Sequence, residues 1–392
     1  ASSSIATLTE NGPYTMENNA LGDIKENPHA WNREAHIMYI DSPTNCGYSY
    51  SEAEEEERQY ANNEDDVSLG LYNTLQYFLH KHPEYRHCKV YITGESYGGK
   101  YITFFSKRIL EENKKLEDPN APPPSYPSSP FHIKLLGIFI NDGLYNPVLQ
   151  AKFRLEYAYA LGIVDKRQYG ILKKRWKILQ GLVGDRKWIE AYHANQKFKT
   201  DILNCGGNPM EYDIRLFADD TPFPQLEAYF TSDEVKTALN VPISQPWLCH
   251  DEKGPVTEHL VQDYMMDTSY LIQDLLDADI PDGNGKLQVL LYAGNFDYSC
   301  GIMGIEQILH DLDWERQEEW QQAIRYVWIG DGQRTKGTIK RVENLTFAVI
   351  PGAGHMVPRN QPETTRELVY HFLFGRRLTL YDPMADPRKE DE

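Results

Sequence analysis

The sequence lacks any uninterrupted apolar run of about 18 residues, so it predicts no transmembrane helix. Basic residues are scarce relative to acidic ones, because the chain has 40 Lys and Arg but 58 Asp and Glu, which gives a formal net charge of -18. This balance argues against nucleic acids and anionic membrane surfaces as partners. With 392 residues, of which 41% are hydrophobic, the chain is long enough for one large core, with or without an insertion.

Cysteine is also scarce, and its spacing argues against two kinds of site. No Cys-x-x-Cys pair occurs, so neither a structural zinc site nor a redox dithiol is expected. Cys46 and Cys88 lie near predicted strands and are expected to be small, buried, apolar side chains. His80, His82 and His87 lie close to Cys88, but they flank a helix end and a strand start, so we expect no metal site and no cofactor. The number of cysteines is odd, which leaves at least one without a partner in this chain: Cys46, Cys88, Cys205, Cys249 and Cys300.

The first residues, Ala1-Ser2-Ser3-Ser4, include no initiating Met, signal peptide or basic leader. The chain therefore reads as one that begins within a longer sequence. Asn344-Leu345-Thr346 is a glycosylation sequon, which makes Asn344 a candidate glycan acceptor in a secreted protein.

Short apolar segments separated by long helix-capable stretches indicate an α/β fold with a mostly parallel sheet covered on both faces. Asp65–Lys81 has apolar residues at helical spacing and is predicted to be a crossover helix. Five segments are predicted to be strands because they are rich in β-branched and aromatic residues: His36–Asp41, Lys89–Thr93, Ile133–Asn141, Leu287–Ala293 and Leu345–Ile350.

The strand pattern stops between Pro147 and about Pro281, where the chain becomes helix-like and charged. This indicates a helical insertion over one end of the sheet. The predicted division is a first part of the core at 1–146, a helical insertion or cap at 147–281, a second part of the core at 282–380 and a disordered tail at 381–392.

Gly94-Glu95-Ser96-Tyr97-Gly98 follows a predicted strand and precedes a predicted helix, as a nucleophile elbow does. The alternative is a serine at an ordinary helix start. The glycines are expected because larger side chains would collide with the neighbouring strand and helix. A serine hydroxyl needs a base, and the base needs an orienting acid. Asp297 and His355 follow two later strands in the order Ser, Asp, His, so they are the candidate acid and base.

These motifs resemble the serine carboxypeptidase family, which includes yeast carboxypeptidase Y and cathepsin A. The supporting stretches are spread over nearly the whole chain: "AWNREAHIMYIDSPTNCGYSYSE", "ITGESYGGKYI", "IFINDGLYNP", "LLYAGNFDYSCG" and "GAGHMVPRNQP". The resemblance implies an α/β-hydrolase fold with a helical insertion, and removal of C-terminal residues from peptides at acidic pH. It also implies a lysosomal, vacuolar or secreted location.

Carried over residue by residue, the resemblance makes Ser96 the nucleophile, Asp297 the acid and His355 the base. It places Tyr97 in the oxyanion hole, through its backbone N–H, and Cys300 and Met356 in the substrate pocket. The family usually shows Gly-Asp-x-Asp where this chain has Gly-Asn-Phe-Asp, but the second Asp is the catalytic one.

The glutamate beside the nucleophile is also explained by the resemblance. Family members bind the substrate's C-terminal carboxylate with a pair of protonated glutamates, which here correspond to Glu95 and Glu10. A carboxyl near another carboxyl in an apolar cleft has a raised pKa, and it donates a hydrogen bond only while protonated. Peptide binding should therefore weaken as pH rises. The alternative is that both residues are ordinary surface acids.

The chain departs from the family at its beginning. The family's Asn-Gly-Gly-Pro-Gly loop, which gives the second oxyanion-hole N–H, would lie immediately before Ala1. We expect it on an upstream fragment of the same precursor or on residues outside this sequence. A family cysteine is also absent at Ala1, so its usual partner, in the region of Cys249, would pair with Cys205 or stay free.

Two other functions remain open at this stage. Some plant relatives are acyltransferases that use an alcohol in place of water. A catalytically weak relative that acts as a binding or protective partner is the third possibility, and only the absent oxyanion loop supports it.

Overall fold

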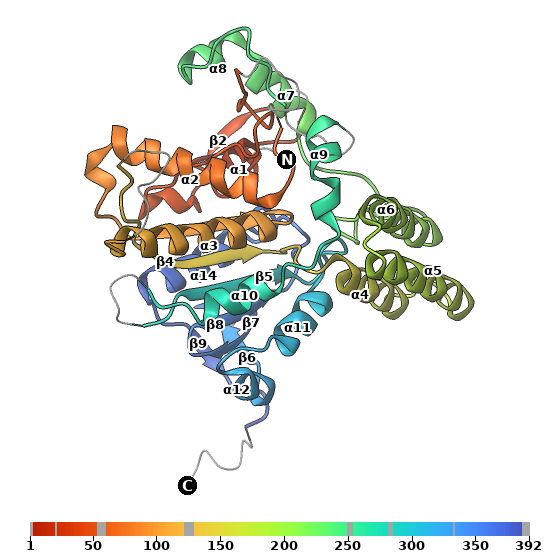
Figure 1. The fold of residues 1–392 in the computed structure, drawn as a ribbon. Helices are drawn as coiled ribbons and strands as arrows, with labels where there is room; N and C mark the ends of the chain where they lie inside the picture. Colours follow the sequence, from red (N-terminus) through yellow and green to blue (C-terminus); the bar gives the residue numbers. More distant parts are fainter. Residues whose placement is uncertain are drawn as a thin grey trace.

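The computed structural model describes residues 3–19, 22–52, 60–120, 129–248, 254–280, 285–331 and 334–385. A seven-stranded sheet lies at its centre, with helices on both faces (Figure 1). The strands follow one another across the sheet in this order: β3 (Val90–Glu95), β4 (Leu135–Asn141), β5 (Gln288–Gly294), β8 (Leu345–Ile350), β7 (Thr335–Val342), β6 (Tyr326–Ile329) and β9 (Thr379–Tyr381).

The first four strands of this order are parallel, and their carboxyl ends meet at one edge of the sheet. Glu95 at the end of β3 is opposite Asn141 at the end of β4. Gly294 at the end of β5 is likewise opposite Ile350 at the end of β8. The remaining pairs, β8–β7, β7–β6 and β6–β9, are antiparallel. Loops that leave β3, β4, β5 and β8 therefore come together, as sites in open parallel sheets do.

A small sheet of β1 (Tyr14–Met16) and β2 (Ile24–Glu26) lies near α1 (Ser4–Thr9).

The helices divide between the two faces of the central sheet and a bundle beside it. The helices are α1 (Ser4–Thr9), α2 (Glu64–Lys81), α3 (Gly98–Glu117), α4 (Pro147–Ala160), α5 (Lys166–Gly184), α6 (Trp188–Cys205), α7 (Phe223–Thr231), α8 (Asp233–Ala238), α9 (Pro255–Tyr264), α10 (Tyr270–Leu276), α11 (Ile302–Asp311), α12 (Gln317–Gln322), α13 (Val357–Asn360) and α14 (Pro362–Phe374).

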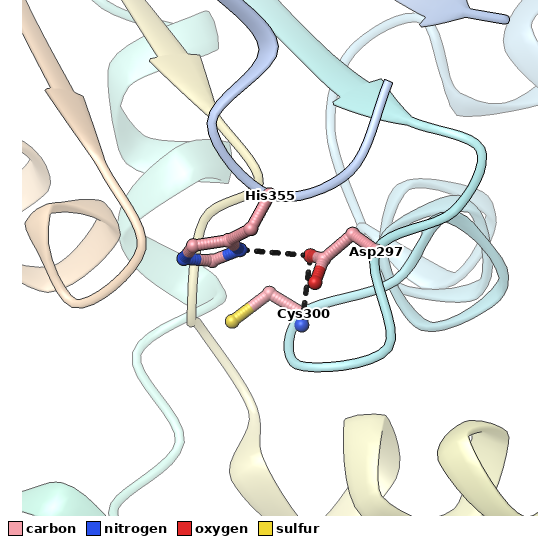
Figure 2. A group of neighbouring side chains, drawn as sticks. All are labelled: Asp297, Cys300 and His355. Carbon is pink, nitrogen blue, oxygen red and sulfur yellow. Dashed lines mark hydrogen bonds and ion pairs between the residues drawn. The ribbon is translucent and has the colours of Figure 1, made fainter. Parts of the chain in front are cut away.

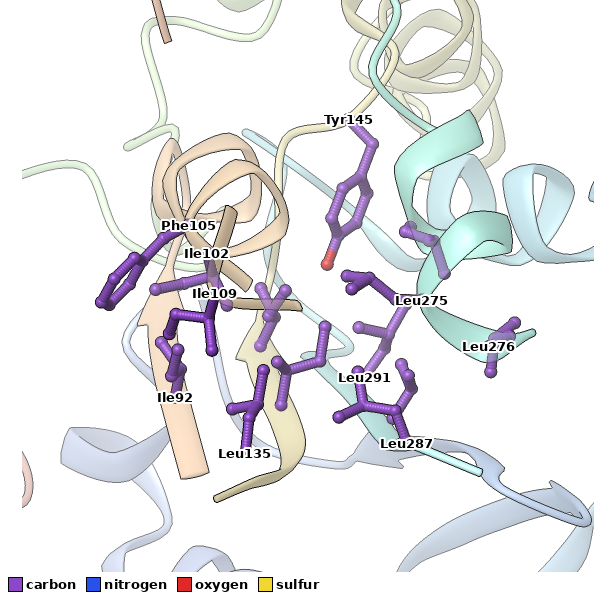
Figure 3. Close-up of a cluster of buried hydrophobic side chains, with 14 of the residues drawn as sticks. Ile92, Ile102, Phe105, Ile109, Leu135, Tyr145, Leu275, Leu276, Leu287 and Leu291 are labelled. Atoms are coloured by element: carbon purple, nitrogen blue, oxygen red, sulfur yellow. The ribbon is translucent and has the colours of Figure 1, made fainter. Parts of the chain in front are cut away.

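The main core lies between one face of the sheet and α2, α3 and α10 (Figure 3). Ile102, Phe105 and Ile109 project from α3 at helical spacing toward Ile92 and Leu135 on the strands. The opposite face packs against α14 through a second cluster that includes Leu368 and Val369. Both faces of the parallel strands are therefore buried, which explains why these strands read as continuous apolar runs.

The helices α4, α5 and α6 form a bundle at one side of the sheet (Figure 1). They share a hydrophobic cluster of their own, which includes Leu155, Leu179 and Phe198. The start of α5 is fixed by a capping box, in which Asp165 and Gln168 each accept a hydrogen bond from the other's backbone N–H. This bundle occupies the part of the chain where the sequence predicts a helical insertion.

The structure confirms the α/β fold with a mostly parallel sheet, and four of the five predicted strands correspond to β3, β4, β5 and β8. The predicted strand His36–Asp41 is wrong, because these residues form no strand and stay half-exposed or exposed. A β-branched and aromatic pattern suits a strand only where a neighbour supplies the hydrogen-bonding partner. In the described sheet the series ends at β3, so this segment has no such partner.

The structure also bears on the predictions for individual cysteines and for the glycosylation sequon. Cys46 is buried, as expected, but Cys88 is exposed. Cys205 carries a free thiol, whose Sγ donates to the Asp201 carbonyl at 3.2 Å, whereas Cys249 lies outside the described residues. Asn344 is unsuited to carry a glycan, because it is buried and its Nδ2 donates to the carbonyls of Leu276 and Leu287 at 2.9 and 2.7 Å.

Among the described residues, no helix is long and apolar enough to cross a membrane. The predicted boundary near residue 281 and most of the predicted tail, 386–392, lie outside the described residues.

Candidate active site

Ser96 occupies the sharp turn between β3 and α3. Its φ of 59° lies in the left-handed region, which a non-glycine residue rarely adopts without a functional reason. The surrounding backbone holds this conformation: the Ser96 N–H donates to the Asn141 carbonyl at 3.1 Å, and its carbonyl accepts from Leu144 at 2.8 Å and from Gly99 at 2.9 Å. The turn therefore has the geometry of a nucleophile elbow at the carboxyl edge of the sheet.

Close packing explains only some of the glycines at this turn. A Cβ added at Gly94 would lie 2.7 Å from a side-chain carbon of Ile102, and one at Gly99 would lie 2.8 Å from the Leu144 carbonyl oxygen. At Gly98, however, no described atom beyond the chain neighbours and the helix's own backbone lies within 4 Å of an added Cβ. The predicted collision therefore holds for Gly94 and is wrong for Gly98, and the crowded position on the helix side is Gly99.

The candidate base and acid meet at the ends of β8 and β5 (Figure 2). His355 Nδ1 lies 3.0 Å from Asp297 Oδ2, and both side chains are buried. The carboxylate also accepts the Ser299 N–H at 2.7 Å and the Cys300 N–H at 2.9 Å. Burial alone would lower the pKa of His355, but the charge and hydrogen bond of Asp297 raise this pKa overall. Asp297 thus orients the ring and favours its protonated form.

The outward nitrogen of the base, His355 Nε2, is buried and has no hydrogen-bond partner among the described residues. It makes no hydrogen bond to Ser96 Oγ in this structure. Catalytic hydrogen bonds are often long or poorly aligned without substrate and tighten when it binds. The N–H of Tyr97 likewise has no partner in the described part of the chain, so it is free to donate to a bound oxygen.

The two glutamates predicted to form a pair lie together in the structure. Glu10 is buried at the end of α1, and its carboxyl contacts that of Glu95 beside Ser96. Burial raises the pKa of Glu10. Burial also raises the pKa of Glu95 well above its usual range, and the charge and hydrogen bond of Glu10 raise it further. Two carboxyls in this environment share protons instead of both ionising.

The two predicted pocket residues lie next to the base. Cys300 is buried, and Met356 directly follows His355. The Cys300 thiol, Asp297 and His355 each offer one potential metal-ligand atom within 4.8 Å of one another. Asp297 already orients His355, however, and burial raises the pKa of Cys300 well above its usual range, so the thiolate that a metal prefers is disfavoured. The arrangement fits acid–base chemistry better than metal binding.

A family model described as serine carboxypeptidase matches residues 1–375. The chain belongs to the serine carboxypeptidase family. Serine carboxypeptidase 3 from Oryza sativa subsp. japonica is 31% identical over 96% of this chain and 71% of its own length. Serine carboxypeptidase 3 from Hordeum vulgare is 30% identical over 96% of this chain and 70% of its own length. Membership in this family makes the chain a hydrolase and peptides its substrate class.

One solved structure supports the fold. A prohormone-processing carboxypeptidase from Saccharomyces cerevisiae superposes with a TM-score of 0.77, covering 95% of this chain and 80% of that chain at 22% identity. At this identity the likeness shows the α/β-hydrolase fold alone.

Two buried residues at and just after the end of β4 lie in the candidate site, although the sequence analysis did not single them out. Asn141 Nδ2 donates to Glu95 Oε2 at 2.6 Å and to the His355 carbonyl at 2.8 Å, so it joins the glutamate pair to the base loop. Asp142 Oδ2 accepts the Gly294 N–H at 3.1 Å. Burial and the nearby Asp297 raise the pKa of Asp142 well above its usual range. The sequence signal that could have identified them is their position at the carboxyl end of a predicted parallel strand.

A second buried cluster lies beneath Tyr97. The Lys100 ammonium, fully buried, donates to the carbonyls of Asp263, Tyr264 and Met266 at 2.6, 3.0 and 2.8 Å. Glu64, at the first turn of α2, is 1% exposed. Burial raises the pKa of Glu64 to about 8, although the Lys100 charge opposes this, and burial lowers the pKa of Lys100 to about 8. The cluster connects the nucleophile helix α3 to α9.

Proposed function

We propose that this chain is a serine carboxypeptidase that releases C-terminal residues from peptides through an acyl-enzyme, with tighter substrate binding at acidic pH. The observation that carries this proposal is the contact between Glu10 and Glu95 directly beside Ser96. An endopeptidase or an esterase has no need for two protonated carboxyls at this position, whereas an exopeptidase must bind a free carboxylate.

In the proposed reaction, Ser96 Oγ attacks the scissile carbonyl while His355 Nε2 accepts its proton. The developing oxyanion receives a hydrogen bond from the Tyr97 N–H. The C–N bond then breaks, His355 returns the proton to the departing amine, and the acyl group remains as an ester on Ser96. Water, deprotonated by His355, hydrolyses that ester and regenerates the serine. Asp297 holds the ring orientation throughout, through the 3.0 Å contact to Nδ1.

The glutamate pair supplies the selectivity for chain ends. While the pair holds a proton, one carboxyl donates to the substrate's C-terminal carboxylate, and Asn141 keeps Glu95 in place. When pH rises through the raised pKa of the pair, the last proton is lost and the pair repels the substrate. KM should therefore increase with pH. The raised pKa of His355 acts on kcat instead, because a protonated base cannot accept the serine proton.

The test compares two substrates that differ only at the chain end: a blocked dipeptide with a free carboxylate and the corresponding amide. For the wild type, KM of the free acid should rise with pH, by up to about tenfold per pH unit above the pKa of the pair, whereas KM of the amide should not. Glu95→Gln should flatten this dependence. Glu111→Gln, at an exposed position on α3, is the matched control.

An unchanged pH dependence of KM in Glu95→Gln would contradict the carboxylate-binding role. Labelling with a fluorophosphonate tests the nucleophile separately: Ser96 should be labelled in the wild type, and Ser96→Ala should remove the label. A labelled protein that transfers acyl groups to an alcohol in preference to water would be an acyltransferase. A folded protein without label would favour the binding role.

We further propose that residues 147–281 form a cap over the site and that the protein works in a lysosome or vacuole or outside the cell. An acidic compartment would keep the glutamate pair protonated, which supports this location.

A further inference from the structure

Arg154, on the inner side of α4, is buried and has no hydrogen-bond or ion-pair partner among the described residues. It is 5% exposed, and its Nε and Nη1 atoms are sealed from solvent with no hydrogen bond. In the described part of the chain, no carboxylate lies within ion-pair distance of its guanidinium. Buried arginines are normally paired, because a charge removed from water is costly without a counter-charge or hydrogen bonds. The Arg154 guanidinium is therefore placed to form an ion pair whose second member is not among the described residues.

One internal candidate for the other half is already engaged. Glu211 acts electrostatically on the same tyrosines as Arg154, namely Tyr264 and Tyr298. Its carboxylate, however, forms an ion pair with Lys199 at 2.7 Å. Glu211 thus does not neutralise Arg154.

The surroundings of Arg154 connect it to the reaction centre. Burial raises the pKa of Cys300 and of Tyr264, and the positive charge of Arg154 offsets part of both increases. The Cys300 N–H holds the catalytic acid Asp297 at 2.9 Å, and Figure 2 shows its thiol on the side of the His355 ring. The Tyr264 ring stacks on the ring of Tyr97 at 5.6 Å, directly after the nucleophile.

Tyr264, on which the charge of Arg154 acts, lies on one particular side of Ser96. The glutamate pair involves the residue before the serine, and Glu10 is hydrogen-bonded to Glu95 and lies in the fields of His355 and Arg359. The wall that includes Tyr97 and Tyr264 involves the residue after it. If the pair holds the terminal carboxylate of the departing residue, the acyl half of the substrate extends along the other wall, toward Arg154.

We propose that Arg154 binds the side-chain carboxylate of the substrate's penultimate residue, so that the protein prefers peptides with Glu or Asp immediately before the scissile bond. This inference rests on the proposed carboxypeptidase function. A guanidinium presents two parallel N–H donors that match a carboxylate, and shielding from water strengthens the pair. The partner that the described residues do not supply would thus arrive with the substrate.

The experiment compares peptides that are identical except for the penultimate residue, which is Glu, Gln, Leu or Lys. For the wild type, kcat/KM for Glu should exceed that for Gln by roughly 10- to 100-fold, and Lys should be the poorest. Arg154→Met should lose most of the rate with Glu but little of the rate with Leu. Arg154→Lys should restore part of the preference, because the charge returns without the two-pronged geometry. Arg167→Met, at an exposed arginine of α5, is the matched control and should leave the preference unchanged.

The outcomes separate this inference from the function on which it rests. Equal rates with Glu and Gln in a wild type that cleaves both peptides would overturn the role of Arg154 and leave the carboxypeptidase intact. Absence of all cleavage, despite labelling of Ser96, would overturn the proposed function.

Binding provides the same comparison without turnover. Calorimetric titration of Ser96→Ala should show tighter binding of the Glu peptide than of the Gln peptide, and Arg154→Met in that background should remove the difference. Equal affinities would contradict the inference. The wild-type comparison of Glu and Gln needs no change at Arg154, so it remains decisive if that variant does not fold.

Discussion

Replacement of Glu64 by Gln should make the protein more stable at neutral pH and weaken the dependence of its stability on pH. The Glu64 side chain is 1% exposed, and neither carboxyl oxygen has a hydrogen-bond partner among the described residues. The nearby Tyr97 hydroxyl favours the charged form of Glu64, whereas the like charge of Asp263 opposes it, and burial outweighs both. The folded protein therefore strongly favours the neutral acid.

The sign and size of the effect follow from proton binding. The unfolded chain releases the Glu64 proton near pH 4.5, whereas the folded chain holds it until the pKa of about 8. Between these values the folded state binds one more proton, so the free energy of unfolding falls as pH rises, by about 1.4 kcal/mol per pH unit. From pH 5 to pH 8 the loss from this group is on the order of 4 kcal/mol. Lys100 acts in the opposite direction only above pH 8, because burial lowers its pKa to about 8.

The assay is urea unfolding of the wild type and Glu64→Gln at pH 5, 6, 7 and 8. The two proteins should be similar at pH 5, and the variant should gain on the order of 1 kcal/mol relative to the wild type with each further pH unit. Buried acids that do not interact with Glu64 contribute equally to both proteins and cancel in the difference. Glu111→Gln should follow the wild type at every pH. Parallel stability curves for Glu64→Gln and the wild type would refute the reasoning.

Three further substitutions probe the site itself. Asp297→Asn should leave the fold intact and lower kcat for peptide hydrolysis by roughly 10⁴-fold, because the tautomer and orientation of His355 are lost; near-normal turnover would show that another acid serves. Asn141→Leu removes the two hydrogen bonds that join Glu95 to the base loop, so kcat/KM should fall by roughly 10- to 100-fold. A shift in the pH dependence of KM would distinguish this loss of hydrogen bonding from a general loss of packing. Asp142→Asn should raise the urea midpoint at neutral pH, since the raised pKa of this acid makes its ionisation costly; an unchanged midpoint at both pH 5 and pH 8 would contradict that.

Local patterns in the sequence are sufficient to predict the parts of the site that come from strand ends. Ser96, Asp297 and His355 each directly follow a strand with a clear apolar run, and parallel strands bring their carboxyl ends to one edge. Glu10 is different, because it lies in a short helix far from the sheet strands in sequence. Only the resemblance to a family indicated that it meets Glu95.

Tertiary burial explains what the sequence analysis missed. Arg154 and Glu64 look like ordinary helix-surface charges in a linear sequence, and only the packing of the insertion helices and of α2 against α3 removes them from water. The same effect makes the sequon at Asn344 misleading, since a tight turn between β7 and β8 buries an amide that the motif alone suggests is accessible. In His36–Asp41 the composition is typical of a strand, but no described strand lies beside the segment to form the hydrogen bonds of a sheet.

The three hydrogen bonds from Lys100 also determine how the molecule can move. They join the last turn of α9 to the first turn of the helix that begins just after the nucleophile. An ammonium inside the protein cannot exchange these carbonyls for water without a large cost, so α9 and the start of α3 behave as one rigid body. A substrate that pushes α9 aside therefore displaces the serine as well. Entry of long peptides must instead be accommodated by segments that this lysine does not hold.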